Sequence, residues 1–333
     1  MASICIRVDA KSSYSGMSNV LRTVALAREL SKLYYDVYFI TKHNCSFVKI
    51  QSEGFNVFKI TDTHALYEGT KKFDHDLIGE NLQEVKQLLE KHNIGTLIID
   101  LPFATEKYIQ TARNLSNRLI LIEDAPRFPT SANIVISSSL FSENIQYPAV
   151  PNQLIIKGSE YCLVDYQIAD ITSRTPRNKV KEIFIYINAH DRTNLVPSLL
   201  STFVLDERIS YFKFHVIVDS LYAGLKEINQ LSLDHPNIQL YNMPDNILKI
   251  MLECDIAISN DLYTIYQLLG CGVPTISVLL SDPDSIYKDK MESQIEYIWN
   301  RKYIGLVNTE TQINLSLLKR IYKLMDNYTM RAT

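Results

Sequence analysis

The sequence is poor in glycine, with 10 in 333 residues, or about 3% against a typical usage near ~7%. It also has no surplus of basic charge, because 34 Lys and Arg stand against 37 Asp and Glu for a net charge of -3. That balance argues against a nucleic-acid partner. An α/β protein that binds nucleotides places glycines where its backbone approaches phosphate. So few glycines indicate that any phosphate-binding loops in this chain depart from the usual glycine-rich form.

The sequence also lacks paired cysteine motifs and long apolar runs. The five cysteines are scattered and form no C-x-x-C pair, which argues against a disulfide framework and a zinc site. We therefore expect no metal and no cofactor. The opening MASICIRVDAK has no basic region before an apolar run, and no window reaches the ~18–20 apolar residues of a membrane helix. We expect a reduced, soluble, cytoplasmic protein without a transmembrane segment.

Short apolar runs alternate with segments of helical period along the whole chain. In the first half, strands are expected over Ser3–Val8, Val37–Ile40, Val57–Ile60, Thr96–Asp100, Leu119–Ile122 and Ile134–Ser137, with helices over Asn19–Leu33, Asn81–His92 and Glu106–Leu115. In the second half, strands are expected over Ile183–Ile187, Tyr211–Val218, Ile238–Tyr241, Ile256–Ser259 and Val273–Val278, with helices over Thr193–Leu205, Leu221–Leu231, Asp245–Cys254, Leu262–Leu269, Ile286–Asn300 and Ile313–Asn327.

This alternation predicts an α/β protein whose parallel sheets are covered by helices on both faces. We expect two Rossmann-like doubly wound domains, residues 1–172 and 182–333, joined by a polar linker at 173–181 that contains Pro176. The last helix is expected to pack back toward the N-terminal domain. Ligands of such sheets bind at the carboxyl ends of the strands, so an inter-domain cleft is the expected site.

The first candidate site follows the first strand. Asp9 directly follows that strand, Gly16, Ser18 and Asn19 lie in a loop of small residues, and Arg22 lies within one turn of the start of the next helix. Free N–H groups and the helix dipole favour an anion at such a position, and Arg22 would add a charged clamp. The alternative is that Ser18 or Asn19 only caps the helix.

Acidic residues follow two further strands. Glu123 and Asp124 come after Leu119–Ile122, and Asp100 ends Thr96–Asp100. Such carboxylates can bind a sugar hydroxyl or act as acid and base. A solvated loop is the alternative.

The second domain carries two more candidate loops. Asn188–Asn194, which includes His190, follows the strand expected at Ile183–Ile187, although His190 is equally consistent with a surface histidine. Ser259–Pro274 joins a strand, a polar turn, a short helix and a G-x-G-V-P turn, and is the most specific stretch of the chain.

Together these stretches resemble one family, the nucleotide-sugar hydrolases of pseudaminic acid biosynthesis (PseG type) and their spore coat polysaccharide relatives (SpsG type), within the GT-B superfamily. The matching stretches run from the first strand to about residue 305: Arg7 and Asp9, Gly16–Asn19, Arg22, Glu123–Asp124, Gly158–Val164, Asn188–Asn194, Met243–Ser259, Gln267–Pro274 and Gln294. The resemblance implies a sugar site in the first domain and a nucleotide site in the second. The residues it assigns to the nucleotide are Asn188, Asp191, Asn194, Met243, Asn260, Tyr263 and Gln267, with a UDP-sugar as the expected ligand.

The chain departs from the family at the residues that carry its chemistry. The histidine that activates water in the family is replaced by Asn19, and a neutral amide cannot accept a proton near pH 7. Ser18 replaces a loop glycine, Asn188 and Ala189 replace a Gly-Gly pair, and Gln267 replaces a glutamate. A substitute base would be Asp9, Asp124 or His190.

Three functions stay open at this point. The chain is a nucleotide-sugar hydrolase, a glycosyltransferase, or a catalytically silent homologue that binds a sugar or a partner enzyme in the same pathway of surface or spore coat polysaccharide synthesis. Nucleotide binding separates the first two from the third. Product formation without an acceptor separates hydrolase from transferase.

Overall fold

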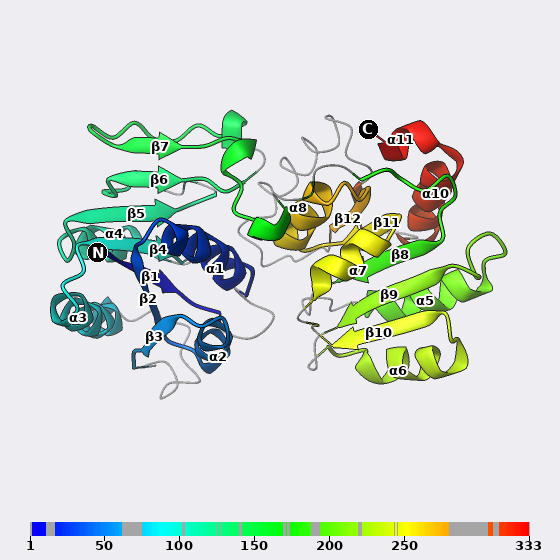
Figure 1. Ribbon diagram of the computed structural model, residues 1–333, viewed down its shortest axis with the longest axis horizontal. Coiled ribbons are helices and arrows are strands. Elements are labelled where there is room, and N and C mark those ends of the chain that lie inside the picture. Colours follow the sequence, from blue (N-terminus) through cyan, green and yellow to red (C-terminus); the bar gives the residue numbers. More distant parts are fainter. Residues whose placement is uncertain are drawn as a thin grey trace. The chain divides into compact units, whose positions relative to one another are not determined.

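The structure is a computed structural model, and it describes most of the chain. The described residues are 2–10, 17–61, 75–101, 104–124, 126, 128–139, 142–168, 171, 174–187, 194–218, 222–242, 244, 246–279, 306–308 and 313–332. The chain divides into two compact units, Met1–Tyr166 and Gln167–Thr333 (Figure 1). The domain boundaries expected at residues 172 and 181 stay predictions.

The first unit is built on a parallel sheet of seven strands in the order β3-β2-β1-β4-β5-β6-β7 (Figure 1). Its strands are β1 Ser3–Val8, β2 Asp36–Thr41, β3 Asn56–Lys59, β4 Thr96–Asp100, β5 Arg118–Ile122, β6 Ile134–Ile136 and β7 Leu154–Ile156. Its helices are α1 Met17–Lys32, α2 Asn44–Ser52, α3 His75–Lys91 and α4 Glu106–Arg113.

Strand β1 shows why this sheet is covered on both faces. Successive side chains of a strand point to opposite faces, so Cys5 and Ile6 enter different cores. Ile6 packs in the core that α1 closes with Val20 and Val24. Cys5 packs in the second core, to which α3 contributes Val85. The apolar run of β1 is therefore buried throughout, as expected of a strand in a parallel sheet.

The second unit repeats the plan with a six-stranded parallel sheet in the order β10-β9-β8-β11-β12-β13 (Figure 1). Its strands are β8 Glu182–Tyr186, β9 Lys213–Val218, β10 Ile238–Asn242, β11 Ile256–Ser259, β12 Thr275–Leu279 and β13 Leu306–Asn308. Its helices include α5 Leu195–Leu205, α6 Leu225–Asp234, α7 Ile247–Glu253, α8 Leu262–Gly270, α10 Ile313–Asp326 and α11 Tyr328–Ala332.

Both sheets reverse their winding direction beside their first strand. From β1 the chain moves outward to β2 and β3, then returns to place β4 on the other side, and β8 and β11 have the same relationship. These are the switch points where the loops of a doubly wound sheet diverge and leave room for a ligand. The predicted fold class, two doubly wound α/β domains, is confirmed.

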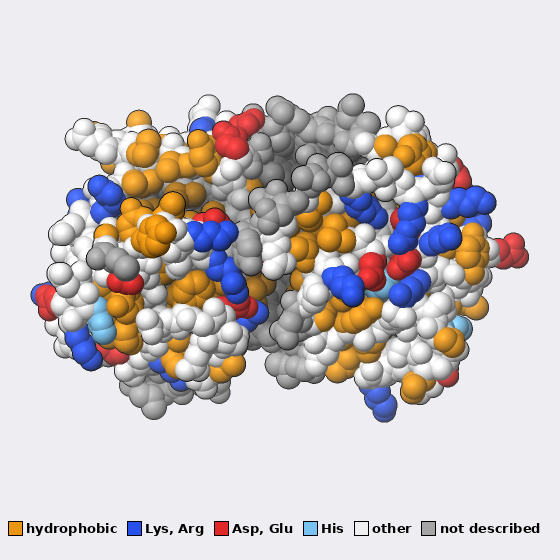
Figure 2. Space-filling view, in the orientation of Figure 1, with side chains coloured by type: hydrophobic (Ala, Val, Ile, Leu, Met, Phe, Trp, Pro, Cys, Tyr) orange, Lys and Arg blue, Asp and Glu red, His pale blue; other side chains and the backbone are white. Residues whose placement is uncertain are grey.

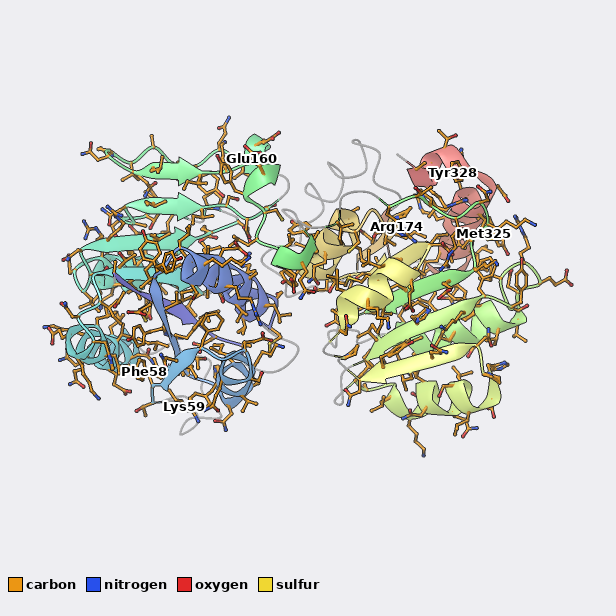
Figure 3. The ribbon with its side chains drawn as sticks, viewed as in Figure 1. Phe58, Lys59, Glu160, Arg174, Met325 and Tyr328 are labelled. Carbon is orange, nitrogen blue, oxygen red and sulfur yellow. The ribbon has the colours of Figure 1, made fainter. Side chains whose placement is uncertain are left out.

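The segment that precedes β8 is held by the second unit. Arg174 Nη1 donates to the Gly272 carbonyl at 3.3 Å, and Arg177 Nη1 lies 3.2 Å from Asp255 Oδ2 (Figure 3). Arg331 of α11 donates to the carbonyls of Arg177 and Asn178 at 2.9 and 3.0 Å. These described contacts of α11 lie within the second unit, and the expected packing of the last helix toward the first domain stays a prediction.

Two further expectations concern the helices. Within the described ranges, no helix has both the length and the apolar character required to cross a bilayer. The helix expected over Ile286–Asn300 lies outside the described residues.

Candidate functional site

Arg22 is the centre of a polar cluster at the carboxyl end of the first sheet. Its Nε donates to Asp100 Oδ2 and its Nη2 to Asp100 Oδ1, both at 2.7 Å. Its Nη1 donates to Ser138 Oγ at 2.9 Å and to Asp124 Oδ2. Arg22 therefore joins groups from the ends of three neighbouring strands, β4, β5 and β6, to helix α1.

Strand register explains why these side chains meet. Val8 at the end of β1 pairs with Asp100 at the end of β4, so both strands finish at one level of the sheet. The loop after β1 leads into α1, which packs on β1 and carries Arg22 across the switch point. Asp124 and Ser138 follow directly after β5 and β6, which lie next in the sheet.

Asn19, which the predicted PseG-type resemblance aligns with a histidine, binds the same carboxylate. Its Nδ2 donates to Asp100 Oδ1 at 2.6 Å. Asn19 and Arg22 lie three residues apart in α1 and thus on one face of the helix. The amide of Asn19 orients a carboxylate here and has no group that could take a proton near neutral pH.

Burial and ion pairing oppose each other in this cluster, with different outcomes for Asp100 and Arg22. The Asp100 side chain is only 1% exposed, and burial raises its pKa against the opposing effects of Arg22 and Asn19. For Arg22, burial works to lower the pKa, but Asp100 and Asp124 outweigh it and hold the pKa well above its ordinary value. Arg22 is thus a permanent cation whose charge is balanced by two carboxylates.

Asp124 is the more accessible of these two carboxylates. Its side chain is 32% exposed, and Arg22 binds its Oδ2. Its Oδ1 accepts hydrogen bonds from the backbone N–H and the Oγ of Ser138, at 2.8 and 3.2 Å. Asp124 is therefore held in one orientation while part of it still faces solvent, which suits a group that meets a ligand.

Asp9 belongs to a separate network beside β2. Arg7 Nη2 donates to its Oδ2 at 2.5 Å, and its Oδ1 accepts from Thr41 Oγ1 at 2.9 Å and from the Lys42 N–H at 2.6 Å. Burial alone would raise its pKa, but Arg7 and these hydrogen bonds together lower it. With a side chain only 16% exposed and a lowered pKa, Asp9 is a weak proton acceptor.

In the second unit, the loop after β11 forms the cap of α8. Asp261 accepts hydrogen bonds from the N–H and Oγ1 of Thr264 at 2.9 and 2.8 Å, and burial raises its pKa. Tyr263 and Gln267 follow on α8, 7% and 6% exposed, and the half-buried Asn260 precedes the cap. Gln267 is a largely buried polar residue on α8, and its amide has both a donor and an acceptor to offer a ligand.

Asn194 begins helix α5 in a left-handed conformation, with φ at +52°. Its Nδ2 lies 3.4 Å from Glu227 Oε2, while its buried Oδ1 has no partner among the described residues. That oxygen packs against Gly224, where an added Cβ would come within 2.0 Å of it. Asn194 thus holds the start of α5 against Gly224.

The structure brings Asn19, Arg22 and Asp124 together and leaves Asp9 in its own network. Ser18 lies in the first turn of α1. The remaining predicted site residues, Gly16, Asn188, His190, Asp191 and Met243, lie outside the described residues. Sequence reasoning missed Ser138, although three consecutive serines directly after an apolar run were a signal for it.

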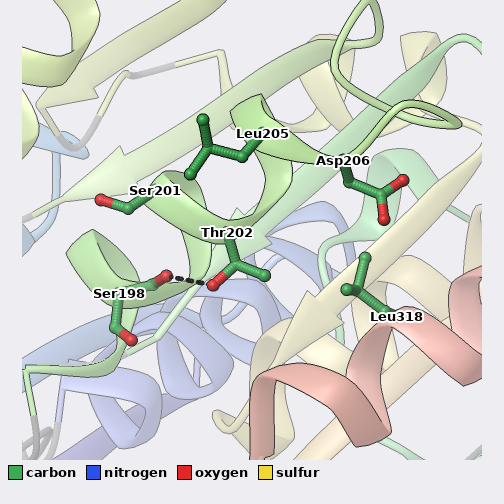
Figure 4. Close-up of a pocket in the computed structure, with 6 residues that line it drawn as sticks. All are labelled: Ser198, Ser201, Thr202, Leu205, Asp206 and Leu318. Atoms are coloured by element: carbon green, nitrogen blue, oxygen red, sulfur yellow. Dashed lines mark hydrogen bonds between the residues drawn. The ribbon is translucent and has the colours of Figure 1, made fainter.

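A shallow groove lies elsewhere, between α5 and α10. Figure 4 shows its lining residues, Ser198, Ser201, Thr202, Leu205, Asp206 and Leu318. Thr202 Oγ1 donates to the Ser198 carbonyl at 2.8 Å, and Asn314 Nδ2 donates to Ser198 Oγ at 2.8 Å. Much of the polar lining is therefore engaged within the protein. The groove also lies on covering helices and away from the strand ends, so it is a weaker candidate than the Arg22 cluster.

Comparison with known proteins identifies the fold. No established protein-family profile matches the sequence. An uncharacterized protein of Methanocaldococcus jannaschii is 25% identical over 274 residues, which cover 78% of this chain and 52% of that protein. The chain thus spans about half the length of the curated relative it matches.

Solved structures match over nearly the whole chain. MurG of Acinetobacter baumannii has a TM-score of 0.66 at 14% identity, covering 99% of this chain and 92% of its own. A UDP-glucosyltransferase of Polygonum tinctorium has a TM-score of 0.67 at 12% identity, covering 99% and 91%. The UDP-GlcNAc 2-epimerase of Neisseria meningitidis has a TM-score of 0.64 at 12% identity, covering 99% and 94%. The narrower resemblance to the PseG and SpsG types stays a prediction, whereas the two doubly wound domains have the GT-B fold.

Proposed function

We propose that this chain binds a nucleoside diphosphate sugar, with a UDP-sugar as the first choice. It cleaves the bond between the anomeric carbon of the sugar and the diphosphate. The acceptor is water or a sugar hydroxyl, and the pathway is surface or spore coat polysaccharide synthesis. The GT-B fold supports a nucleotide sugar, since solved proteins with this fold include a UDP-glucosyltransferase and an epimerase bound to UDP-GlcNAc.

The observation that carries the proposal is the Arg22 cluster with its partly exposed Asp124. Arg22 and Ser138 hold this carboxylate in one orientation just beyond the end of β5. A carboxylate in that state binds sugar hydroxyls or accepts a proton from the attacking group. The acceptor oxygen forms a bond to the anomeric carbon, and the proton of that oxygen passes to the base. The nucleoside diphosphate leaves with the electrons of the broken C–O bond.

The nucleotide would bind in the second unit at the start of α8. The amide of Gln267 can supply both a donor and an acceptor for ribose hydroxyls. His190, Asp191, Asn188, Asn194, Met243, Asn260 and Tyr263 remain proposed contacts of the same ligand.

A catalytically silent homologue is the second candidate, and two observations favour it. Asn19 stands at the position of the family's base and uses its amide to hold Asp100. The charge of Arg22 is already balanced by Asp100 and Asp124, so it offers little net attraction to a diphosphate. Such a protein would bind a sugar or a partner enzyme without turnover.

Calorimetric titration with UDP, then CMP and GDP, tests the proposal. We expect one nucleotide to bind in the micromolar range and Gln267→Ala to weaken it at least tenfold. Gln230→Ala is the matched control, because that glutamine lies exposed on α6 and its amide donates to Asp234 of the same helix. Nucleotide release without an added acceptor would then identify a hydrolase. No binding of any nucleotide at millimolar concentration would contradict both enzyme functions.

A further inference from the structure

Three side chains of types that commonly bind metals lie close together in the second unit, away from the proposed nucleotide site. They are Glu182 at the start of β8, His215 in β9 and Glu253 at the end of α7, and their ligand atoms all lie within 4.8 Å of one another. Ligands of a parallel sheet bind at the carboxyl ends of its strands. Glu182 is the first residue of β8, so this group lies toward the opposite end of that strand.

The strand register brings Glu182 and His215 to one face of the sheet. Phe184 pairs with His215 in the neighbouring strand, and residues two apart in a strand share a face. Glu182 and His215 therefore point the same way, and His215 Nε2 lies 2.8 Å from Glu182 Oε2. Helix α7 packs against β8 and adds Glu253 at its last residue.

Hydrogen bonds behind His215 fix its ring for a cation. Its Nδ1 lies 3.0 Å from the Tyr241 hydroxyl, and that hydroxyl donates its one proton to Gln239 Oε1 at 2.7 Å. Nδ1 must then be the donor to Tyr241, because the hydroxyl has no second proton. The opposite ring nitrogen, Nε2, is thereby directed at the Glu182 carboxylate, and both can turn toward one ion.

We propose that Glu182, His215 and Glu253 bind a divalent transition metal ion such as Zn²⁺ or Mn²⁺. One imidazole with two carboxylates is a ligand set that these ions accept, and it leaves further positions for water. His215 is fully buried and already oriented by Tyr241, the kind of outer hydrogen bond that metal-binding histidines make. The two carboxylates are only partly buried and can close on the ion.

Two basic side chains compete with the ion. Lys213 Nζ lies 3.9 Å from Glu182 Oε2, the oxygen that faces His215, and Arg177 Nη1 lies 3.1 Å from Glu182 Oε1. Glu253 has no ion pair within the ranges that the structure describes. Figure 2 shows acidic, basic and histidine side chains gathered over this part of the second unit, around α7 and the adjoining strands. A bound ion would link β8, β9 and α7, so we expect it to stabilise the folded protein.

The test is calorimetric titration of the untagged, metal-stripped full chain with ZnCl₂, MnCl₂ and MgCl₂. We expect one Zn²⁺ or Mn²⁺ per chain in the micromolar range, much weaker Mg²⁺ binding, and a rise in melting temperature with the ion. Glu253→Gln removes a ligand from the surface side and should weaken binding about tenfold or more. Lys213→Gln removes the competing cation and should tighten it.

Several outcomes would overturn the proposal. The first is the absence of one-to-one binding at millimolar metal, and the second is unchanged affinity in Glu253→Gln. Binding of Co²⁺ with a thiolate charge-transfer band would assign the ion to cysteine and exclude this site. Because Glu253 and Lys213 are not in the hydrophobic core, both variants are expected to fold, which keeps the comparison interpretable.

Discussion

Arg22 and Asp100 meet through two parallel hydrogen bonds, Nε to Oδ2 and Nη2 to Oδ1, each 2.7 Å long. This forked arrangement fixes both side chains in one geometry and is stronger than a single contact. It ties α1 to β4 at the switch point of the first sheet. The pair therefore supports the fold of the loop region as well as any ligand that binds there.

Arg22→Ala should destabilise the protein strongly. The substitution leaves Asp100, only 1% exposed, as an uncompensated buried carboxylate, a change that costs about 3–5 kcal/mol. Urea unfolding of the variant and the parent measures the loss. Arg28→Ala is the control, because the Arg28–Glu53 pair is more exposed and should contribute less than about 1 kcal/mol. Equal losses in the two variants would show that the Arg22 pair has no special role in the fold.

The acid stability of the protein should depend on Asp9. Arg7 and the hydrogen bonds from Thr41 and Lys42 lower its pKa in the folded state, although burial opposes them. A lowered pKa contributes stability that is complete above the unfolded value of ~3.9 and is lost as the pH falls through the folded value. Asp9→Asn should therefore cost about 1–3 kcal/mol at neutral pH and make the loss of stability below about pH 4 less steep.

Melting temperatures of the parent and Asp9→Asn between pH 7 and pH 2.5 test this expectation. The control is Asp326→Asn, whose exposed side chain pairs only with Arg208 in the described structure. Two parallel curves for the parent and Asp9→Asn would mean that Asp9 does not carry the predicted acid dependence.

The sequence predicted most of the fold because its buried strands are short apolar runs with polar ends. Strands Ser3–Val8, Thr96–Asp100 and Ile256–Ser259 were predicted at their observed bounds. The strands β7 and β13, each three residues long, were missed, although the equally short β6 was predicted from its apolar run. Helix α2 was missed as well, because it buries only Ser46 and Ile50 and has no clear apolar face.

The candidate site could be predicted only in part. The positions of the loops in the sequence predicted Asn19, Arg22 and Asp124 as site residues. They did not show that the Arg22 guanidinium would donate hydrogen bonds to Asp100, Asp124 and Ser138 together. That relationship depends on the alignment of strand ends, which no local pattern records. The group of Glu182, His215 and Glu253 was missed for the same reason, since its spacing matches no metal-binding motif.

Gly270→Ala should reduce stability even though alanine favours helix. Gly270 ends α8, and an added Cβ would lie 2.5 Å from Ile168 Cγ2, a branched side chain with little freedom to move. Overpacking of this kind costs about 1–3 kcal/mol. Gly95→Ala is the control, because its nearest neighbour there is the amide of Asn117 at 3.2 Å. The double variant with Ile168→Ala should show a favourable coupling, and purely additive losses would contradict the steric explanation.

Replacing Asn19 by histidine tests whether a base at this position speeds the proposed reaction. The Asn19 amide donates to Asp100 Oδ1 at 2.6 Å, so an imidazole at this position can donate one N–H to the same carboxylate and keep its second nitrogen free. General base catalysis typically contributes ~10²–10⁴ in rate. We therefore expect Asn19→His to accelerate nucleotide release from a panel of UDP-sugars at least tenfold over the parent, while Asn19→Gln, which has no base, does not. If both variants bind UDP and neither releases nucleotide from a UDP-sugar, the lack of a base at position 19 does not account for the lack of reaction. A binding role for this protein then becomes the better explanation.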